Sequence, residues 1–253
     1  MDSENAPHGL NLTELEFWDR YWSAKAGIGQ TIVPYRYLFT DILTRLFAID
    51  SARRFLEIGG FPGFYSVWFS KYLSYSSSLV DIYIKPEIVE SLTRVNGIAP
   101  INTIQSDIFR FEPAEKFDVV MSAGLIEHFT DLPAIIERHR RCLRDGGRLI
   151  VCVPNFLGVN GLLQRWVDGE NFKAHNLAAM DLEAMRSVLQ AQGFKDIRSS
   201  YHGGFGVWIE EARCRSKAVR TLLRWINYAR IPFNVLRLNT KAFAPYIVYI
   251  ATK

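Results

Sequence analysis

Apolar residues recur at helical spacing within the first fifty positions. Those at positions 12, 15, 18 and 22 predict a helix over residues 12–24. Those at positions 38, 42, 43 and 46 predict a second helix over about residues 35–49. We expect these two helices to form an N-terminal helical cap, residues 1–50, ahead of a main domain over residues 51–253.

Beyond residue 50, short apolar runs alternate with helical patterns. Strands are predicted at residues 54–58, 78–84, 101–105, 117–122, 148–153, 195–200 and 244–252. Helices are predicted at residues 64–73 and 85–96, from the cap residue Asp131 to residues 145–147, and from the cap residue Asp181 to Gly193. This alternation predicts a parallel α/β sheet covered by helices on both faces. Ligands of such sheets bind beyond the carboxyl ends of the strands, where we therefore expect the chemistry.

The turn after the first strand is rich in glycine, in the sequence Phe55-Leu-Glu-Ile-Gly-Gly-Phe-Pro-Gly63. Glycine lets a backbone approach a ligand closely, and the amides that begin the next helix point toward that ligand. A dinucleotide-binding fingerprint would require glycine at positions 61 and 64, which are both phenylalanine. No Gly-Lys-Ser/Thr follows, so the turn is not a P-loop either.

The spacing Glu57-x-Gly59-x-x-x-Gly63 resembles motif I of the class I S-adenosylmethionine-dependent methyltransferases. In that family the loop cradles the amino acid part of the cofactor. The resemblance implies cofactor-binding roles here for Glu57, Gly59, Gly60, Phe61 and Gly63. The chain departs from the family at Phe61, where the motif has its middle glycine.

Acidic residues follow the next two strands. Asp81 lies 22 positions after Gly59, where a carboxylate can accept hydrogen bonds from two ribose hydroxyls. The resemblance assigns this role to Asp81, with Ile82 beside it; a solvated acid at a strand end is the alternative. It also implies that Asp107 accepts from the adenine amino group and that Ile108 is the apolar neighbour of the ring.

Two further segments, residues 117–129 and 143–154, resemble the fourth strand and the helix-to-fifth-strand junction of the same family. The resemblance places Ser122 at the end of a strand beside the cofactor. It covers about residues 52–156 and implies S-adenosyl-L-methionine as the cofactor and S-adenosyl-L-homocysteine as the product. The implied fold is Rossmann-like, with a mostly parallel seven-stranded sheet, an antiparallel last strand and helices on both faces.

Methyl transfer from a sulfonium is an in-line displacement, so the enzyme mainly positions and deprotonates the acceptor. Histidine is the usual base near neutral pH. His128 is the first candidate for a catalytic residue, Glu127 is placed to orient it, and His175 is the second candidate. The alternatives are that His128 packs against the cofactor or caps a helix and that His175 lies at the surface. No cysteine or histidine pattern has zinc spacing, so no metal is expected.

This chain lacks a sequence motif that accompanies one class of methyl acceptors. Family members that methylate DNA bases or glutamine carry [N/D]-P-P-[Y/F] where this chain has Ser122-Ala-Gly-Leu125. We therefore expect O-methylation of a small molecule, a glycan or a glycan precursor. The alternatives are a catalytically degenerate binding protein, suggested by Phe61, and a methyltransferase acting at an anionic membrane or on a lipid-linked substrate.

Aromatic residues and charge add two expectations. Trp18, Tyr21, Trp22 and Tyr35 either cover the bound cofactor and acceptor or fill the core. Residues 212–253 hold nine of the 30 basic residues and no acid, and about residues 212–240 are predicted to form a basic amphipathic helix inserted before the last strand.

Three interpretations of this basic helix stay open. It packs on the domain with its basic face in water, it contacts an anionic membrane, or it binds nucleic acid, which is not favoured. Three cysteines and the absence of a signal peptide suggest the cytoplasm, with peripheral membrane contact as the alternative. The sequence carries no specific signal for an oligomer.

Overall fold

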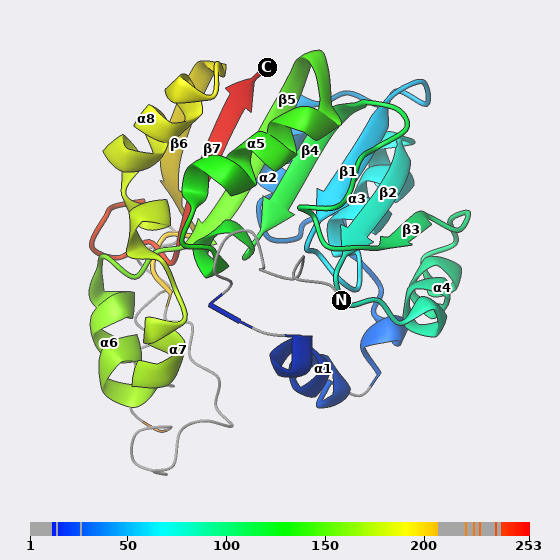
Figure 1. Cartoon of the computed structure of the whole chain (residues 1–253). Coiled ribbons are helices and arrows are strands. Elements are labelled where there is room, and N and C mark those ends of the chain that lie inside the picture. The colour runs from blue at the N-terminus through cyan, green and yellow to red at the C-terminus, as the bar shows by residue number, and fades with distance from the viewer. Residues whose placement is uncertain are drawn as a thin grey trace, which may run out of the picture.

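The computed structural model describes residues 12–13, 15–25, 27–206, 221, 225, 228, 236 and 239–253. Its seven strands form one sheet in the order β3-β2-β1-β4-β5-β7-β6 (Figure 1). The strands are β1 (Arg54–Ile58), β2 (Ser76–Asp81), β3 (Asn102–Gln105), β4 (Phe117–Ala123), β5 (Leu143–Pro154), β6 (Lys195–His202) and β7 (Tyr246–Thr252). Pairing is parallel from β3 to β5, whereas β7 runs antiparallel to both β5 and β6. The predicted fold, including its antiparallel last strand, is confirmed.

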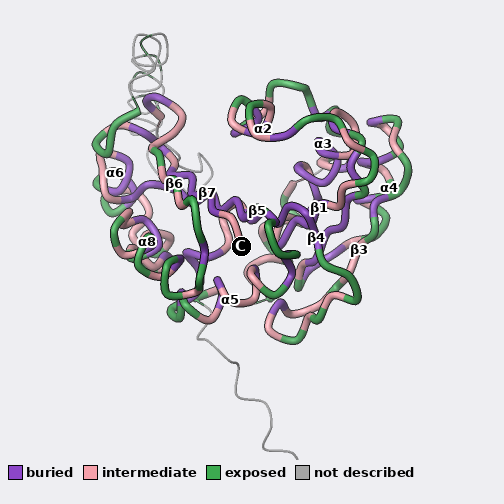
Figure 2. Tube along the Cα trace, turned by 90° about the horizontal axis from the view of Figure 1, so that it is seen from above, coloured by how far each residue is buried: buried purple, intermediate pink, exposed green. Residues whose placement is uncertain are grey.

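Helices cover both faces of this sheet. They are α1 (Leu15–Ser23), α2 (Thr40–Leu46), α3 (Phe64–Leu73), α4 (Pro86–Val95), α5 (Leu132–Cys142), α6 (Val159–Val167), α7 (Gly169–Lys173) and α8 (Leu182–Ala191), with the 3-10 turns η1 (Ile28–Gln30), η2 (Ile126–His128) and η3 (Leu177–Met180). One apolar cluster joins α5 and α8 to the sheet, and a second joins α2 and α3 to its other face. Buried residues accordingly run through the middle of the molecule between these layers (Figure 2).

Two predicted helix starts are confirmed by their caps. The Asp131 carboxylate accepts a hydrogen bond from Ala134 N at 2.9 Å, and the Asp181 carboxylate accepts from Ala184 N at 2.9 Å. Each cap satisfies an amide that has no partner within its own helix.

Three predicted boundaries were wrong. The second helix begins at Thr40 rather than at residue 35, because the preceding Phe39 takes a left-handed conformation (φ 67°). The strand predicted to reach residue 84 ends at Asp81, whose carboxylate accepts from Tyr83 N and turns the chain. The helix predicted to reach residues 145–147 ends at Cys142, because Leu143 already pairs with Phe117 in the sheet.

The first fifty residues do not pack uniformly. The buried residues Val33, Phe39, Leu43 and Phe47 share an apolar cluster with β1 and α3, whereas α1 has no buried residue. The cap boundary at residue 50 stays a prediction. Figure 1 shows α1 beyond the carboxyl ends of the central strands.

Most of the basic helix predicted at about residues 212–240 lies outside the described residues. Within the part of the chain that the structure does describe, no helix combines the length and apolar character needed to cross a membrane.

Candidate active site

Two cavities open at the carboxyl edge of the sheet and share part of their walls. The Asp81 cavity, of about 450 Å³, lies over the ends of β1, β2 and β3. The Glu127 cavity, of about 360 Å³, lies over the ends of β1, β4 and β5. The shared residues are Gly59, Gly124, Trp18, Trp22 and His128. A ligand that extends past these residues would occupy both cavities.

Asp81 is held in place by backbone amides of its own surroundings. Its Oδ2 accepts from Phe61 N at 3.0 Å, and its Oδ1 accepts from Tyr83 N at 2.9 Å. Burial raises the pKa of Asp81 to about 6, although these two hydrogen bonds oppose the shift. Each oxygen retains acceptor capacity, so the carboxylate can still take two hydroxyl donors from a ligand.

The other predicted nucleoside contacts lie in the same cavity. Ile82, Asp107 and Ile108 all line it. The Asp107 carboxylate accepts from Phe109 N at 2.9 Å, which fixes the loop after β3. The structure therefore brings together at one sheet edge four residues that the sequence singled out at two separate strand ends.

The glycine turn after β1 disfavours a side chain at Gly59, through its positive φ and its contact with the Leu125 side chain, which would have to move. Gly59 has φ 64°, and an added Cβ would lie 2.5 Å from Leu125 Cδ1. Gly63 lies in neither cavity among the described lining residues; it has φ 97° and precedes the first residue of α3. Its positive φ turns the chain into α3, and its predicted contact with the cofactor stays a prediction.

Glu57 and Gly60 complete this turn and line the Glu127 cavity. The buried Glu57 carboxylate accepts from Ser66 N at 2.7 Å, so it ties the strand to the first turn of α3. Burial raises the pKa of Glu57 to about 7.

Phe61 replaces the middle glycine without blocking the turn. Among the described residues, positive φ at non-glycine positions occurs only at Phe39, Ser74 and Asp196, so position 61 does not need glycine. The buried Phe61 ring packs edge-on against Trp22 and against Tyr83, each at a centroid distance of 5.3 Å. The departure from motif I thus fixes the α1 segment to the loop.

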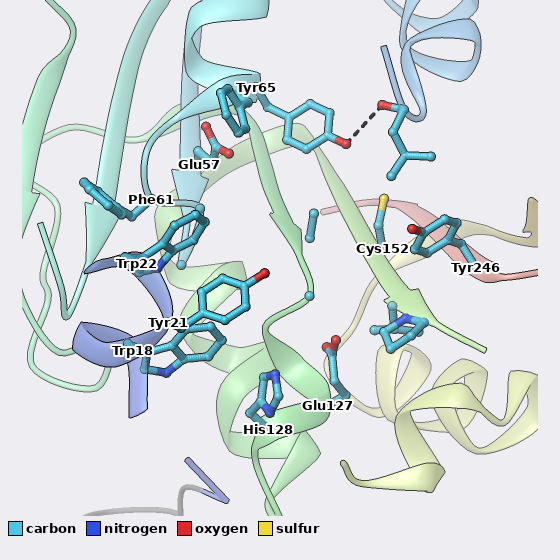
Figure 3. A pocket seen from close by; sticks show the side chains of 18 of the residues that line it. Trp18, Tyr21, Trp22, Glu57, Phe61, Tyr65, Glu127, His128, Cys152 and Tyr246 are labelled. Atoms are coloured by element: carbon cyan, nitrogen blue, oxygen red, sulfur yellow. Dashed lines mark hydrogen bonds between the residues drawn. The ribbon is translucent and has the colours of Figure 1, made fainter. Parts of the chain in front are cut away.

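Ten aromatic side chains line the Glu127 cavity. Those lining it are Phe17, Trp18, Tyr21, Trp22, Tyr37, Phe39, Phe61, Phe64, Tyr65 and Tyr246. Figure 3 shows the rings of α1 on one side of the cavity and Cys152 and Tyr246 on the other. Of the aromatic residues predicted to cover the site, Tyr35 does not line either cavity; it stacks on Trp68 instead (6.2 Å, 27°).

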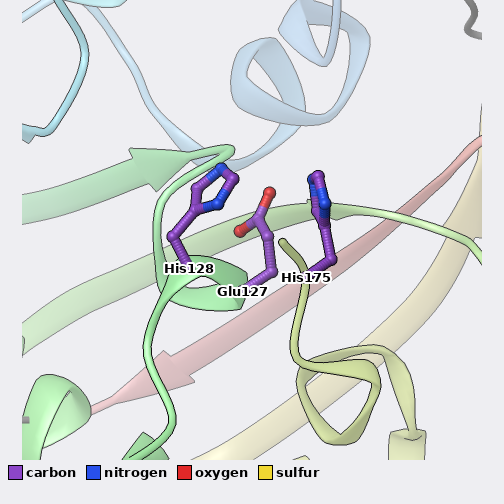
Figure 4. Close-up of side chains that lie close together, drawn as sticks. All are labelled: Glu127, His128 and His175. Carbon is purple, nitrogen blue, oxygen red and sulfur yellow. The ribbon is translucent and has the colours of Figure 1, made fainter. Parts of the chain in front are cut away.

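The three predicted catalytic residues lie together in this cavity. Glu127 and His128 belong to η2 after β4, and His175 follows α7. Asn176 N donates to Glu127 O at 2.6 Å and joins the two segments. The His128 and His175 rings lie 4.7 Å apart, and Figure 4 shows the Glu127 carboxylate between them.

In both histidines, one ring nitrogen is hydrogen-bonded to a backbone carbonyl oxygen. His128 Nδ1 lies 3.0 Å from Ala174 O, and His175 Nδ1 lies 2.6 Å from Asn171 O. A carbonyl oxygen only accepts, so each neutral ring carries its proton on Nδ1 and keeps a lone pair on Nε2. Trp18 packs edge-on against His128 at 5.4 Å, which links the cap helix to the cluster.

Burial governs the protonation of this cluster. Burial, and then the nearby His175, lowers the pKa of His128 to about 3, and burial lowers the pKa of His175 as well. Burial raises the pKa of Glu127 to about 8. Glu127 is 1% exposed, and among the described residues its Oε2 has no hydrogen-bond partner.

The structure does not bring Ser122 to the other residues predicted to bind the cofactor. Of the described residues, Ser122 lines neither cavity. Its Oγ lies 2.9 Å from Nε2 of the buried His139, whose Nδ1 is bonded to Ile135 O. Ser122 therefore points toward α5 and serves the core, because successive strand residues face opposite sides of a sheet.

Comparison with known proteins assigns the family. A methyltransferase-domain family model matches residues 32–199. No curated protein sequence matches the chain.

Solved structures share the fold at low sequence identity. An S-adenosylmethionine-dependent methyltransferase from Archaeoglobus fulgidus has a TM-score of 0.56 at 18% identity, over 95% of this chain and 100% of that one. Phosphoethanolamine N-methyltransferase 2 from Haemonchus contortus, in complex with phosphomonomethylethanolamine and S-adenosylhomocysteine, has a TM-score of 0.61 at 18% identity, over 94% of this chain and 59% of that one. A putative O-methyltransferase from Nostoc punctiforme has a TM-score of 0.56 at 14% identity, over 94% of this chain and 59% of that one.

The family model covers more than half of the chain, and the sheet order and the glycine turn after β1 agree with it. The chain therefore belongs to the methyltransferase-domain family, within the class I S-adenosylmethionine-dependent methyltransferases.

Proposed function

We propose that this enzyme transfers a methyl group from S-adenosylmethionine to a hydroxyl oxygen of a small molecule, a glycan or a glycan precursor. The observation that carries the proposal is the meeting of the two cavities at Gly59, Gly124 and His128. A cofactor lying across this junction would present its methyl group to the Glu127 cavity.

The Asp81 cavity suits the adenosine part of the cofactor. Asp81 would accept from the two ribose hydroxyls, and Asp107 would accept from the adenine amino group. Ile82 and Ile108 supply apolar contacts for the base. The amino acid part would then lie along Gly59 and Gly60, where the backbone permits close approach.

The Glu127 cavity suits an acceptor with an apolar or flat face, because ten aromatic side chains line it. The acceptor hydroxyl would face Glu127, His128 and His175. In the reaction the acceptor oxygen forms a bond to the methyl carbon as the carbon–sulfur bond breaks. The hydroxyl proton passes to a base, for which His128 Nε2 is the candidate, and S-adenosylhomocysteine leaves.

Two alternative functions, a binding protein without catalysis and an enzyme acting at a membrane or on a lipid-linked substrate, depend on particular parts of the chain. The binding-protein alternative arose from Phe61, whose ring packs against Trp22 and Tyr83 and leaves the turn at Gly59 intact. Action at an anionic membrane or on a lipid-linked substrate depends on about residues 212–240, most of which lie outside the described residues. The related structures are named for both N- and O-methylation, so the acceptor atom must be measured.

A transfer assay with matched acceptors tests the proposal. The purified protein is incubated with methyl-labelled S-adenosylmethionine and pairs that differ only in a hydroxyl or an amino group, such as a phenol and its aniline or a sugar and its amino sugar. We expect label on the hydroxyl member, and loss of transfer in Asp81→Ala. Label confined to amines, or cofactor binding without any transfer, would contradict O-methylation. Repeating the assay with neutral and anionic vesicles tests the membrane alternative.

A further inference from the structure

We propose that Glu127, His128 and His175 form a binding site for one divalent transition-metal ion. Two imidazole nitrogens and one carboxylate oxygen are a donor set that suits zinc, iron(II), cobalt and manganese. Magnesium and calcium prefer oxygen ligands alone, so they fit this set less well. No spacing in the sequence predicted a metal site, because His175 lies 47 positions after His128 and comes close to it only in the folded chain.

The three donor groups are close enough to share one ion. One ligand atom from each residue lies within 4.8 Å of the others. All three side chains belong to buried residues, with exposed fractions of 1% for Glu127, 8% for His128 and 7% for His175. Donors around one zinc ion lie about 2.0–2.2 Å from the metal, so binding would draw them together by rotation of their side chains.

The histidines have the surroundings that metal-binding histidines need. Each Nδ1 is bonded to a backbone carbonyl, at Ala174 for His128 and at Asn171 for His175. This hydrogen bond fixes the ring and its tautomer and leaves Nε2 free to bind a metal. The bond from Asn176 N to Glu127 O holds the two ligand-bearing segments together before any ion binds.

The Glu127 side chain supplies an independent sign of a missing cation. Its Oε2 is fully buried and has no hydrogen-bond partner among the described residues. Leaving such an atom unpaired is costly, and buried acids are normally hydrogen-bonded, paired or bound to metal. A metal ion between the two imidazoles would satisfy this oxygen directly.

Three protein ligands leave coordination positions open toward the cavity, as in catalytic zinc sites. When bound, the ion would supply Lewis-acid polarisation of an oxygen that coordinates it. If that oxygen is the acceptor hydroxyl, this role rests on the proposed function. With the ion bound, His128 Nε2 would be a ligand rather than the base, and the hydroxyl, acidified by the ion, would lose its proton to water. Binding of the ion itself does not depend on methyl transfer.

Metal titration of the chelator-treated full chain tests the site. Zn²⁺ is titrated by calorimetry, and Co²⁺ is titrated by its visible absorption, which reports the ligand geometry. We expect one equivalent of each ion to bind the wild type, and Glu127→Gln and His175→Asn each to weaken Zn²⁺ binding at least about 100-fold. The control is His202→Asn, which removes a histidine 3.5 Å from the Asp41 carboxylate outside both cavities and should leave Zn²⁺ binding unchanged.

Binding of S-adenosylhomocysteine by each variant verifies that it is folded. Absence of stoichiometric Zn²⁺ and Co²⁺ binding to the wild type, or equal binding by folded Glu127→Gln and His175→Asn, would overturn the site. Metal binding without transfer to any acceptor would support the site and refute the proposed function. Methyl transfer by a protein that binds no ion would support the proposed function and refute the metal site.

Discussion

Asp81 and Glu127, the acids after which the two cavities are named, are held in opposite ways. In the Asp81 cavity, the carboxylate accepts two backbone amides, from Phe61 and Tyr83. In the Glu127 cavity, Oε2 of Glu127 has no hydrogen-bond partner among the described residues. The Asp81 carboxylate is therefore held in place before a ligand arrives, whereas the Glu127 carboxylate has a buried oxygen that no described residue satisfies and that a ligand, an ion or water can satisfy. This difference suggests that the Asp81 cavity recognises an invariant cofactor and that the Glu127 cavity performs the reaction.

The largest effect on cofactor binding is expected from Gly59→Ala. The residue has φ 64°, and the new Cβ would lie 2.5 Å from Leu125 Cδ1, at the junction of the cavities. We expect calorimetry to show S-adenosylhomocysteine affinity reduced by at least about 100-fold. Gly97→Ala is the matched control, because φ is 66° there and nothing lies within 4 Å of its Cβ position. It should cost about 1 kcal/mol of unfolding free energy and no affinity.

Acidification should have opposite effects, through Asp81, on S-adenosylhomocysteine affinity and on the free energy of unfolding. Burial raises the pKa of Asp81 from 3.8 to about 6, so at about pH 5 the empty site holds mostly the neutral acid. Loss of charge-assisted hydrogen bonds should then weaken S-adenosylhomocysteine binding by about tenfold relative to about pH 7.5.

The raised pKa of Asp81 affects folding stability in the opposite direction from cofactor binding: acidification favours the folded state. A raised pKa in the folded state stabilises the protein below pH 3.8, and this contribution is lost as the pH rises through about 6. Asp81→Asn should remove the Asp81 contribution to both pH dependences, measured by calorimetry and by urea unfolding. The raised pKa values of Glu57 and Glu127 would still contribute to the pH dependence of unfolding. An affinity that is equally pH-dependent in Asp81→Asn would contradict the assignment.

A smaller effect is expected from Trp22→Ala, which removes a wall shared by both cavities and a ring contact to Phe61. We expect S-adenosylhomocysteine affinity to fall about five- to tenfold. Stability should change little, because no residue of α1 is buried. Arg20→Ala, on the same helix but outside both cavities, is the control. Equal affinities for the two variants would show that α1 is not part of the site.

The smallest effect on binding is expected from Ser122→Ala. Its hydroxyl donates to His139 Nε2 in the core, so its removal should lower the free energy of unfolding by about 1–3 kcal/mol. Cofactor affinity should stay within about twofold of the wild type. A large loss of affinity in a stably folded Ser122→Ala protein would restore the original prediction that Ser122 lies beside the cofactor.

The cofactor cavity was largely predictable from the sequence, because its residues follow individual strands. Gly59, Asp81 and Asp107 each lie just after an apolar run, and parallel strands bring their carboxyl ends to one edge. Ser122 is not among the described residues that line either cavity, because a position near the end of a strand does not by itself determine which face of the sheet a side chain occupies. Alternation along β4 puts Ser122 on the same face as Val120, toward α5.

The acceptor cavity was only partly predictable, because its wall comes from distant segments. Tyr37, Tyr65 and Tyr246 lie on different elements and meet only in the folded chain. No local pattern marks them as lining residues, since aromatic residues at such positions also fill cores. The catalytic candidates Glu127, His128 and His175 were predicted individually, but their grouping as three donors for one ion depends on the packing of η2 against the segment after α7.

The most direct test of the two-cavity account is one calorimetric comparison. S-adenosylhomocysteine is titrated into the wild type, Asp81→Ala and His175→Asn, since His175 lines only the Glu127 cavity. The account predicts micromolar binding by the wild type, a loss of at least about tenfold in Asp81→Ala, and a change of no more than about twofold in His175→Asn. Unchanged affinity in Asp81→Ala, or an equal loss in both variants, would contradict the separation of cofactor and acceptor cavities.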